Sequence, residues 1–118
     1  MTACPTIRLM DVIGKKWTFV ILQQISYNGH SGFNNLLRMI GEITPKILSQ
    51  RLQELESEDI VRKDVSDVKT KTTHYALTKK GVELKQILDN LRVWNTKYSS
   101  NKTDCPTRGC VNCELFRN

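Results

Sequence analysis

The chain has 118 residues, of which 39% are hydrophobic and 25% are charged. This length suits one compact domain, and the composition is that of a globular protein and excludes a disordered one. The longest apolar run, Phe19–Leu22, is far too short to span a bilayer, and the first residues do not form an apolar signal segment. We therefore expect a cytoplasmic protein with no membrane partner. The 18 Lys and Arg exceed the 12 Asp and Glu, and the resulting net charge of +6 favours an anionic partner such as nucleic acid.

Apolar residues at helical spacing predict three short helices before residue 42. The first begins at Pro5 and stops at Gly14, the second covers residues 17–25, and the third covers residues 33–40. Ser31 is the expected cap of the third helix, because its hydroxyl can accept a hydrogen bond from a free backbone N–H. The inward face expected for the first helix consists of Ile7, Met10 and Ile13.

Thr44 and Pro45 mark the start of a fourth helix, which runs to about Glu58. Threonine supplies a capping oxygen, and proline at the first helical position lacks an N–H that would have no partner there. One face of this helix is expected to lie in the core and carries Leu48, Leu52 and Leu55. The opposite face, called the polar face below, consists of Lys46, Ser49, Gln50, Gln53 and Ser57.

The polar face of the fourth helix carries no charge except that of Lys46. Exposed helix faces usually carry Glu and Lys side chains at a spacing of four residues, and this face lacks them. Gln and Ser are hydrogen-bonding residues that suit base edges and phosphates. The face therefore favours nucleic-acid binding, and an ordinary solvated surface is the alternative interpretation.

After Ile60 the apolar residues alternate, which predicts a two-stranded hairpin with a basic tip at Lys69 and Lys71. Thr78 then caps a last helix. The apolar stripe of this helix is longer than the core of one small domain requires, so we expect part of it to lie against a second copy of the chain. The residues expected at this dimer interface are Leu84, Leu88, Leu91, Trp94 and Tyr98.

Several short motifs accompany this order of four helices, a hairpin and a final helix. They are Cys4-Pro5, Asp11-Val12-Ile13-Gly14, Lys16-Trp17, Phe33-Asn34, Ile43-Thr44, Leu55-Glu56, Ile60-Val61 and Tyr75-Ala76-Leu77-Thr78. In order and spacing they closely resemble the HxlR family of bacterial and archaeal transcriptional regulators, which are relatives of the MarR type. The resemblance covers residues 4–98 and implies a mainly α fold with a small β-hairpin. This fold is a winged helix-turn-helix with N- and C-terminal dimerisation helices.

The family resemblance implies a transcriptional regulator that binds double-stranded DNA as a homodimer. Because a twofold dimer presents two copies of the fourth helix, we expect an inverted-repeat operator. Helices 33–40 and 45–58 would form the helix-turn-helix, and the hairpin would be the wing, with its two tip lysines near the minor groove or its phosphates. The residues implied to face the major groove are Thr44, Pro45, Lys46, Ser49, Gln50 and Gln53. Two features depart from the family pattern. Gly32 stands where a basic residue is usual, and the wing tip lacks the frequent Pro-Pro-Arg sequence.

Three of the four cysteines, Cys105, Cys110 and Cys113, lie in a tail of residues 99–118 outside the resemblance, whereas Cys4 opens the first helix. The C-x4-C-x2-C spacing with a remote fourth cysteine satisfies the ligand count of a tetrahedral zinc site and matches plant-type iron-sulfur binding. The alternatives are plain disulfides and oxidant sensing, which the resemblance implies for a cysteine at the position of Cys4. A tail with so little apolar surface cannot order itself by burial, so we predict that a disulfide or a metal anchors it.

His30 and His74 have no ligand spacing and are expected to be ordinary loop and strand residues. The sequence contains no Gly-rich phosphate loop, paired apolar carboxylates or nucleophile beside a histidine, so no enzymatic activity is expected. Cys110 and Cys113 have the spacing of a thiol-disulfide redox protein but lack its βαβ context. A general nucleic-acid-binding or interaction module is a closer alternative to the DNA-binding regulator. A salt-sensitive preference for duplex DNA over single strands would distinguish the two.

Overall fold

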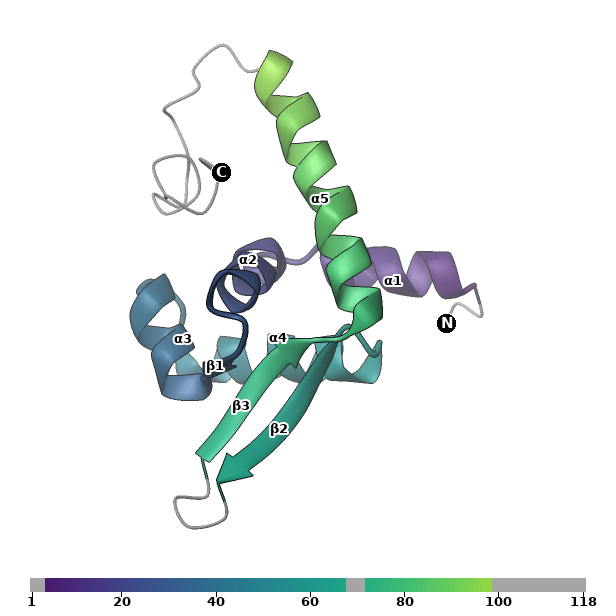
Figure 1. Cartoon of the computed structure of the whole chain (residues 1–118). Coiled ribbons are helices and arrows are strands. Elements are labelled where there is room, and N and C mark those ends of the chain that lie inside the picture. Colours follow the sequence, from purple (N-terminus) through teal and green to yellow (C-terminus); the bar gives the residue numbers. More distant parts are fainter. Residues whose placement is uncertain (1–3, 68–71, 99–118) are drawn as a thin grey trace.

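The computed structural model describes residues 4–67 and 72–98. These residues form a mainly helical fold with a small antiparallel sheet (Figure 1). The predicted combination of helices with a hairpin between the fourth helix and the last is confirmed. In chain order the elements are α1 (Pro5–Ile13), α2 (Thr18–Asn28), β1 (Ser31–Gly32), α3 (Phe33–Ile40), α4 (Pro45–Ser57), β2 (Val61–Asp67), β3 (Thr72–Leu77) and α5 (Lys79–Tyr98).

The start of α4 follows from its two predicted starting residues. The Thr44 Oγ1 atom accepts a hydrogen bond from the backbone N–H of Ile47 at 3.2 Å, and Pro45 occupies the first helical position. The side-chain oxygen thus satisfies one of the N–H groups that a helix leaves free at its beginning. The helix then ends where Asp59 adopts a left-handed conformation, with φ of 62°.

The start of α5 is fixed by Thr78, as predicted, and by a close approach to the end of α4. Thr78 Oγ1 accepts the backbone N–H of Gly81 at 3.0 Å and donates to the carbonyl oxygen of Asp59 at 2.6 Å. A Cβ atom at Gly81 would lie only 2.1 Å from the carbonyl oxygen of Ile60. Glycine therefore allows the first turn of α5 to lie directly against the segment that follows α4.

The region around Ser31 differs from its prediction. Ser31 does not cap α3 but lies buried in β1, where its Oγ accepts a hydrogen bond from Asn28 Nδ2 at 3.0 Å. The short strand β1 pairs antiparallel with β3, so the predicted hairpin is part of a sheet with strand order β1-β3-β2. A strand of two residues is too short to show an alternating pattern, so β1 could not be predicted from the sequence.

The core is formed by one face of each of α2, α3, α4 and α5 together with the sheet. It includes the three leucines predicted for the inner face of α4. Its fully buried apolar side chains are Ile21, Leu22, Ile25, Leu36, Leu48, Leu52, Leu55 and Ile60.

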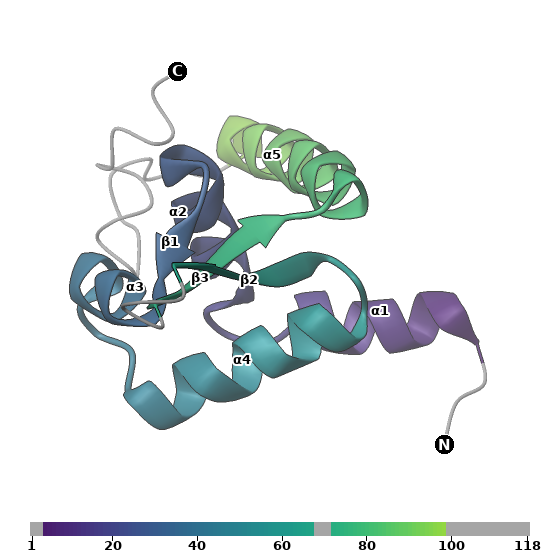
Figure 2. The same cartoon turned by 60° about the horizontal axis from the view of Figure 1, so that its bottom comes forward.

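Helix α1 does not place its predicted face in this core. Ile7 and Met10 are 48% and 57% exposed, Ile13 is half-buried, and Val12 is buried instead. The physical reason is that α1 projects from the body (Figure 2). Its core contacts come from Leu9, Val12 and Ile13, on a side of the helix that excludes Ile7 and Met10. The expectation that Ile7 and Met10 face the core of their own protomer is therefore wrong.

The apolar stripe of α5 divides into two parts. Leu84 and Leu88 are both 8% exposed and belong to the core of the protomer, which leaves them little surface for a second chain. Farther along the helix, Leu91, Trp94 and Tyr98 are 55%, 57% and 76% exposed. The C-terminal end of α5 extends beyond the other described elements (Figure 1). Among the described helices, none combines the length and apolar character that crossing a membrane requires.

Candidate nucleic-acid interface

Of the six residues predicted for the major groove, Thr44 and Pro45 stand at the start of α4, and Lys46, Ser49, Gln50 and Gln53 share the helix face opposite the leucines. Five of them are exposed and Ser49 is half-buried. Their exposure follows from the leucine face, which turns the opposite side of the helix outward. Figure 2 shows α4 along one side of the molecule, next to α3 and the hairpin. The structure therefore presents one long helix face on which hydrogen-bonding side chains are accessible.

A short turn joins α3 to α4 and holds the two helices in a fixed relation. Helix α3 ends at Gly41, whose φ of 85° is in the left-handed region and whose N–H donates to the carbonyl oxygen of Leu37 at 2.9 Å. The next apolar residue, Ile43, is buried and anchors the turn in the core. Residues 33–57 thus form two helices joined by a tight turn, which is the arrangement of a helix-turn-helix.

The hairpin of β2 and β3 lies beside α4, in the position expected of a wing (Figures 1 and 2). The strands pair from Val61 opposite Leu77 to Asp67 opposite Thr72, with an irregularity between Val65 and Asp67. The predicted tip residues Lys69 and Lys71 lie outside the described residues. Their approach to DNA remains a prediction, and the structure describes only the strands that lead to them.

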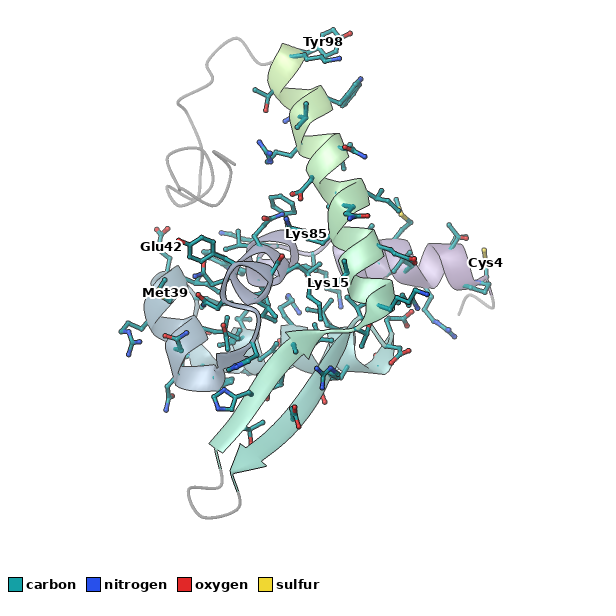
Figure 3. The ribbon with its side chains drawn as sticks, in the orientation of Figure 1. Cys4, Lys15, Met39, Glu42, Lys85 and Tyr98 are labelled. Atoms are coloured by element: carbon teal, nitrogen blue, oxygen red, sulfur yellow. The ribbon has the colours of Figure 1, made fainter. Side chains whose placement is uncertain are left out.

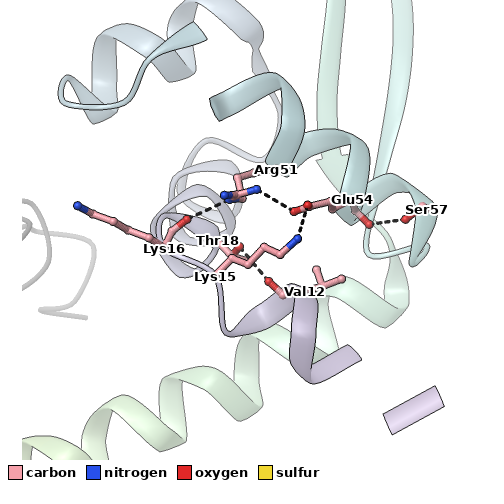
Figure 4. A network of polar contacts seen from close by, with 7 residues as sticks. All are labelled: Val12, Lys15, Lys16, Thr18, Arg51, Glu54 and Ser57. Atoms are coloured by element: carbon pink, nitrogen blue, oxygen red, sulfur yellow. Dashed lines mark hydrogen bonds and ion pairs between the residues drawn. The ribbon is translucent and has the colours of Figure 1, made fainter. Parts of the chain in front are cut away.

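A polar network missed by the sequence analysis joins α4 to the turn between α1 and α2 (Figure 4). Glu54 of α4 accepts hydrogen bonds from Lys15 Nζ at 2.5 Å and from Arg51 Nη1 at 3.1 Å. Arg51 Nε also donates to the carbonyl oxygen of Lys16 at 3.2 Å. The spacing of Arg51 and Glu54 on a helix indicates their pairing, but no local pattern indicates the contact with Lys15, which is 39 residues away.

The two histidines are not the isolated residues that the sequence suggests. Their ring centroids are 5.0 Å apart in an edge-to-face arrangement, because His30 precedes β1 and His74 lies on the neighbouring strand β3. Within the described residues, the buried Nδ1 atom of His74 has no hydrogen-bond partner. No group of three or more metal-ligating side chains occurs among those same residues, so the pair is not part of such a cluster.

Cys4 is exposed at the N-terminal end of α1, which is the end of this helix that projects away from the body (Figure 3). The backbone N–H groups of Ile7 and Thr6, at the start of α1, favour the thiolate and lower the pKa of the Cys4 thiol below its ordinary value. The three tail cysteines lie outside the part of the chain that the structure describes. Whether they meet Cys4, in a disulfide or around zinc or an iron-sulfur cluster, stays a prediction.

The sequence profile of the HxlR-like helix-turn-helix family matches residues 12–103. The chain belongs to this family. The uncharacterized HTH-type transcriptional regulator YvaP of Bacillus subtilis is 32% identical over 96 residues, which are 80% of this chain and 88% of YvaP. The family and these relatives are transcriptional regulators and not enzymes, so the prediction that the protein is not an enzyme is confirmed.

Similar solved structures of transcriptional regulators confirm the winged helix-turn-helix. Reduced YodB from Bacillus subtilis superposes with a TM-score of 0.73 at 26% identity, covering 85% of this chain and 97% of that one. HypR, described as a redox regulator in its oxidized form, superposes with a TM-score of 0.70 at 30% identity and covers 83% of this chain and all of its own. This HxlR-like chain is thus a DNA-binding transcription regulator of the winged helix type.

Proposed function

We propose that the protein regulates transcription as a homodimer that binds an inverted repeat in double-stranded DNA and reads its sequence with α4. The observation that carries this proposal is the accessible polar face of α4, on which amide and hydroxyl groups outnumber charges. The amides and hydroxyls of this polar face cannot form salt bridges with one another, but they can form hydrogen bonds with base edges.

The dimensions of α4 suit the major groove. An α-helix with side chains is about 10–12 Å across, close to the groove width of about 12 Å. Gln50 and Gln53 each carry a donor and an acceptor, the combination that pairs with the N6 and N7 edge of adenine. Ser49 and Lys46 would contact bases or phosphates, and Thr44 and Pro45 would bring the helix N-terminus close to the backbone. Lys69 and Lys71 of the wing would contact phosphates beside the minor groove.

The dimer is supported by apolar side chains that stay exposed in the protomer. On α5 these are Leu91, Trp94 and Tyr98, and on α1 they are Ile7 and Met10. Exposed apolar surface on two projecting helices is typical of an interface between chains. Twofold symmetry would then present two copies of α4 to half-sites about 34 Å apart, one turn of the duplex.

The cysteines are proposed to make this regulator redox-responsive. Support comes from the lowered pKa of the exposed Cys4 thiol, which raises the fraction of reactive thiolate at neutral pH. A related structure is that of HypR, which is described as a redox regulator. The tail cysteines 105, 110 and 113 would be resolving thiols for Cys4. Binding of zinc or an iron-sulfur cluster would appear instead as bound metal that is lost in acid or chelator.

Selection of bound sequences from a pool of random duplexes tests the proposed function. We expect enrichment of an inverted repeat with half-sites about 10 base pairs apart. The selected duplex should also bind more tightly than either of its single strands. Equal affinity for single strands, or enrichment of no sequence, would instead support a general nucleic-acid-binding module.

A further inference from the structure

The carboxylate of Glu54 forms ion pairs with two cations at the edge of the polar face of α4 (Figure 4). One cation, Arg51, belongs to α4 itself, and the other, Lys15, comes from the turn between α1 and α2. This arrangement pins the turn to the helix that is proposed to enter the major groove.

The two cations are held to different degrees. The Arg51 side chain is only 16% exposed and is fixed at two points, by Glu54 and by the Lys16 carbonyl oxygen. The Lys15 side chain is 43% exposed, and Glu54 is the partner of its ammonium group. An exposed lysine-carboxylate pair contributes little to stability and exchanges easily. Lys15 is therefore the cation that can leave Glu54 without disturbing the fold.

Lys15 also lines a cleft of about 470 Å³ together with Gln50, Arg51, Gln53, Glu54 and Ser57. Gln50 and Gln53 belong to the polar face, so the cleft borders the surface that is proposed to read bases. When a helix lies in the major groove, the phosphates of both strands pass along its two sides. A lysine ammonium on a flexible stem suits such a phosphate, because it offers three donors without a fixed orientation.

We propose that this cleft is a phosphate subsite, in which one DNA backbone phosphate replaces Glu54 as the ion-pair partner of the Lys15 ammonium group. The inference rests on the proposed function and adds to it a contact from outside the helix-turn-helix. In the free protein Glu54 pairs with both cations, and in the complex Lys15 Nζ pairs with phosphate while Arg51 keeps Glu54 in place. Glu54 is thus an internal competitor of DNA that limits affinity for every sequence alike.

The Lys15→Met and Glu54→Gln variants test the subsite, since methionine keeps the apolar stem and glutamine keeps the shape. We expect Lys15→Met to weaken binding to selected and random duplexes equally, and to reduce the slope of log affinity against log salt by about 0.9. Lys15→Arg should retain that slope. Glu54→Gln should strengthen binding about fivefold at low salt. In the Glu54→Gln background, Lys15→Met should cost more affinity than it does in the wild type.

Lys85 and Asp89 of α5 provide the matched control, because they form another lysine-carboxylate pair at 2.7 Å. Figure 2 places α5 on the side of the molecule opposite α4. Lys85→Met should leave the salt slope unchanged and Asp89→Asn should not strengthen binding.

The outcomes separate the subsite from the proposed function. An unchanged slope in Lys15→Met, an equal loss in Lys85→Met, or weaker binding by Glu54→Gln would overturn the subsite. The last result would mean that Glu54 only positions its neighbours. If the wild type itself shows no preference for duplex DNA, the proposed function fails instead.

Discussion

Replacing Gly81 with alanine tests the contact between the beginning of α5 and the end of α4. The added Cβ would lie 2.1 Å from the carbonyl oxygen of Ile60 and 3.1 Å from its carbonyl carbon. Backbone atoms cannot rotate away as a side chain does, so the first turn of α5 must move by about 1 Å to restore an ordinary contact.

The cost of this movement follows from the bonds at the same place. The carbonyl oxygen of Ile60 accepts the N–H of Thr78 at 3.0 Å, and the Thr78 hydroxyl donates to Asp59 at 2.6 Å. Loss of two hydrogen bonds costs about 1–3 kcal/mol, and overpacking adds a cost of about 1–3 kcal/mol. We therefore expect Gly81→Ala to lower the free energy of unfolding by about 2–6 kcal/mol, the sum of these two costs. In a domain of this size the melting temperature would fall by roughly 10–30 °C.

Urea unfolding followed by circular dichroism measures this loss, with Gly32→Ala as the control. A Cβ at Gly32 would meet its nearest atom at 3.6 Å, an ordinary contact, and the φ of −78° is open to alanine. The control should therefore change stability by less than about 1 kcal/mol. If Gly81→Ala proved as stable as Gly32→Ala, the assigned approach of α5 to Ile60 would be incorrect.

Two further predictions concern the projecting helices. Changing Leu91 and Trp94 together to aspartate should convert a dimer into a monomer in sedimentation, because it places charges in the proposed interface; a wild type that sediments as a concentration-independent monomer would rule out the dimer. In a chain whose tail cysteines are serine, alkylation of Cys4 should reach half its maximal rate at a lower pH in the native protein than in urea. The reason is that folding lowers the pKa of its thiol, so identical pH profiles would contradict the role of the Ile7 and Thr6 amides.

Sequence reasoning succeeded where local signals determine structure. The cap Thr44, the following Pro45 and the leucine periodicity all lie within one helix, so both the bounds and the inner face of α4 could be predicted. The order of helices and hairpin was equally local, and together with the short sequence motifs it indicated the family. The polar face of α4 could be predicted for the same reason, because the exposed side of an amphipathic helix lies opposite its apolar side.

Contacts between distant segments could not be predicted in this way. The pairing of β1 with β3, the meeting of His30 with His74 and the ion pair of Lys15 with Glu54 each join residues far apart in sequence. None of them has a periodic pattern. The inward face assigned to α1 failed for a related reason, because periodicity shows that a helix has an apolar face but does not show which chain covers it.

The affinity of Gln50→Ala for selected and random duplexes tests the central claim, base reading by α4, most directly. Gln86→Ala is the control, because Gln86 is an exposed glutamine on α5. If Gln50 bonds a base, its replacement should cost about 1–3 kcal/mol on the selected duplex and almost nothing on random DNA. Gln86→Ala should change neither affinity. Equal losses by Gln50→Ala on both duplexes, or no loss on either, would contradict the assignment of the polar face to sequence recognition.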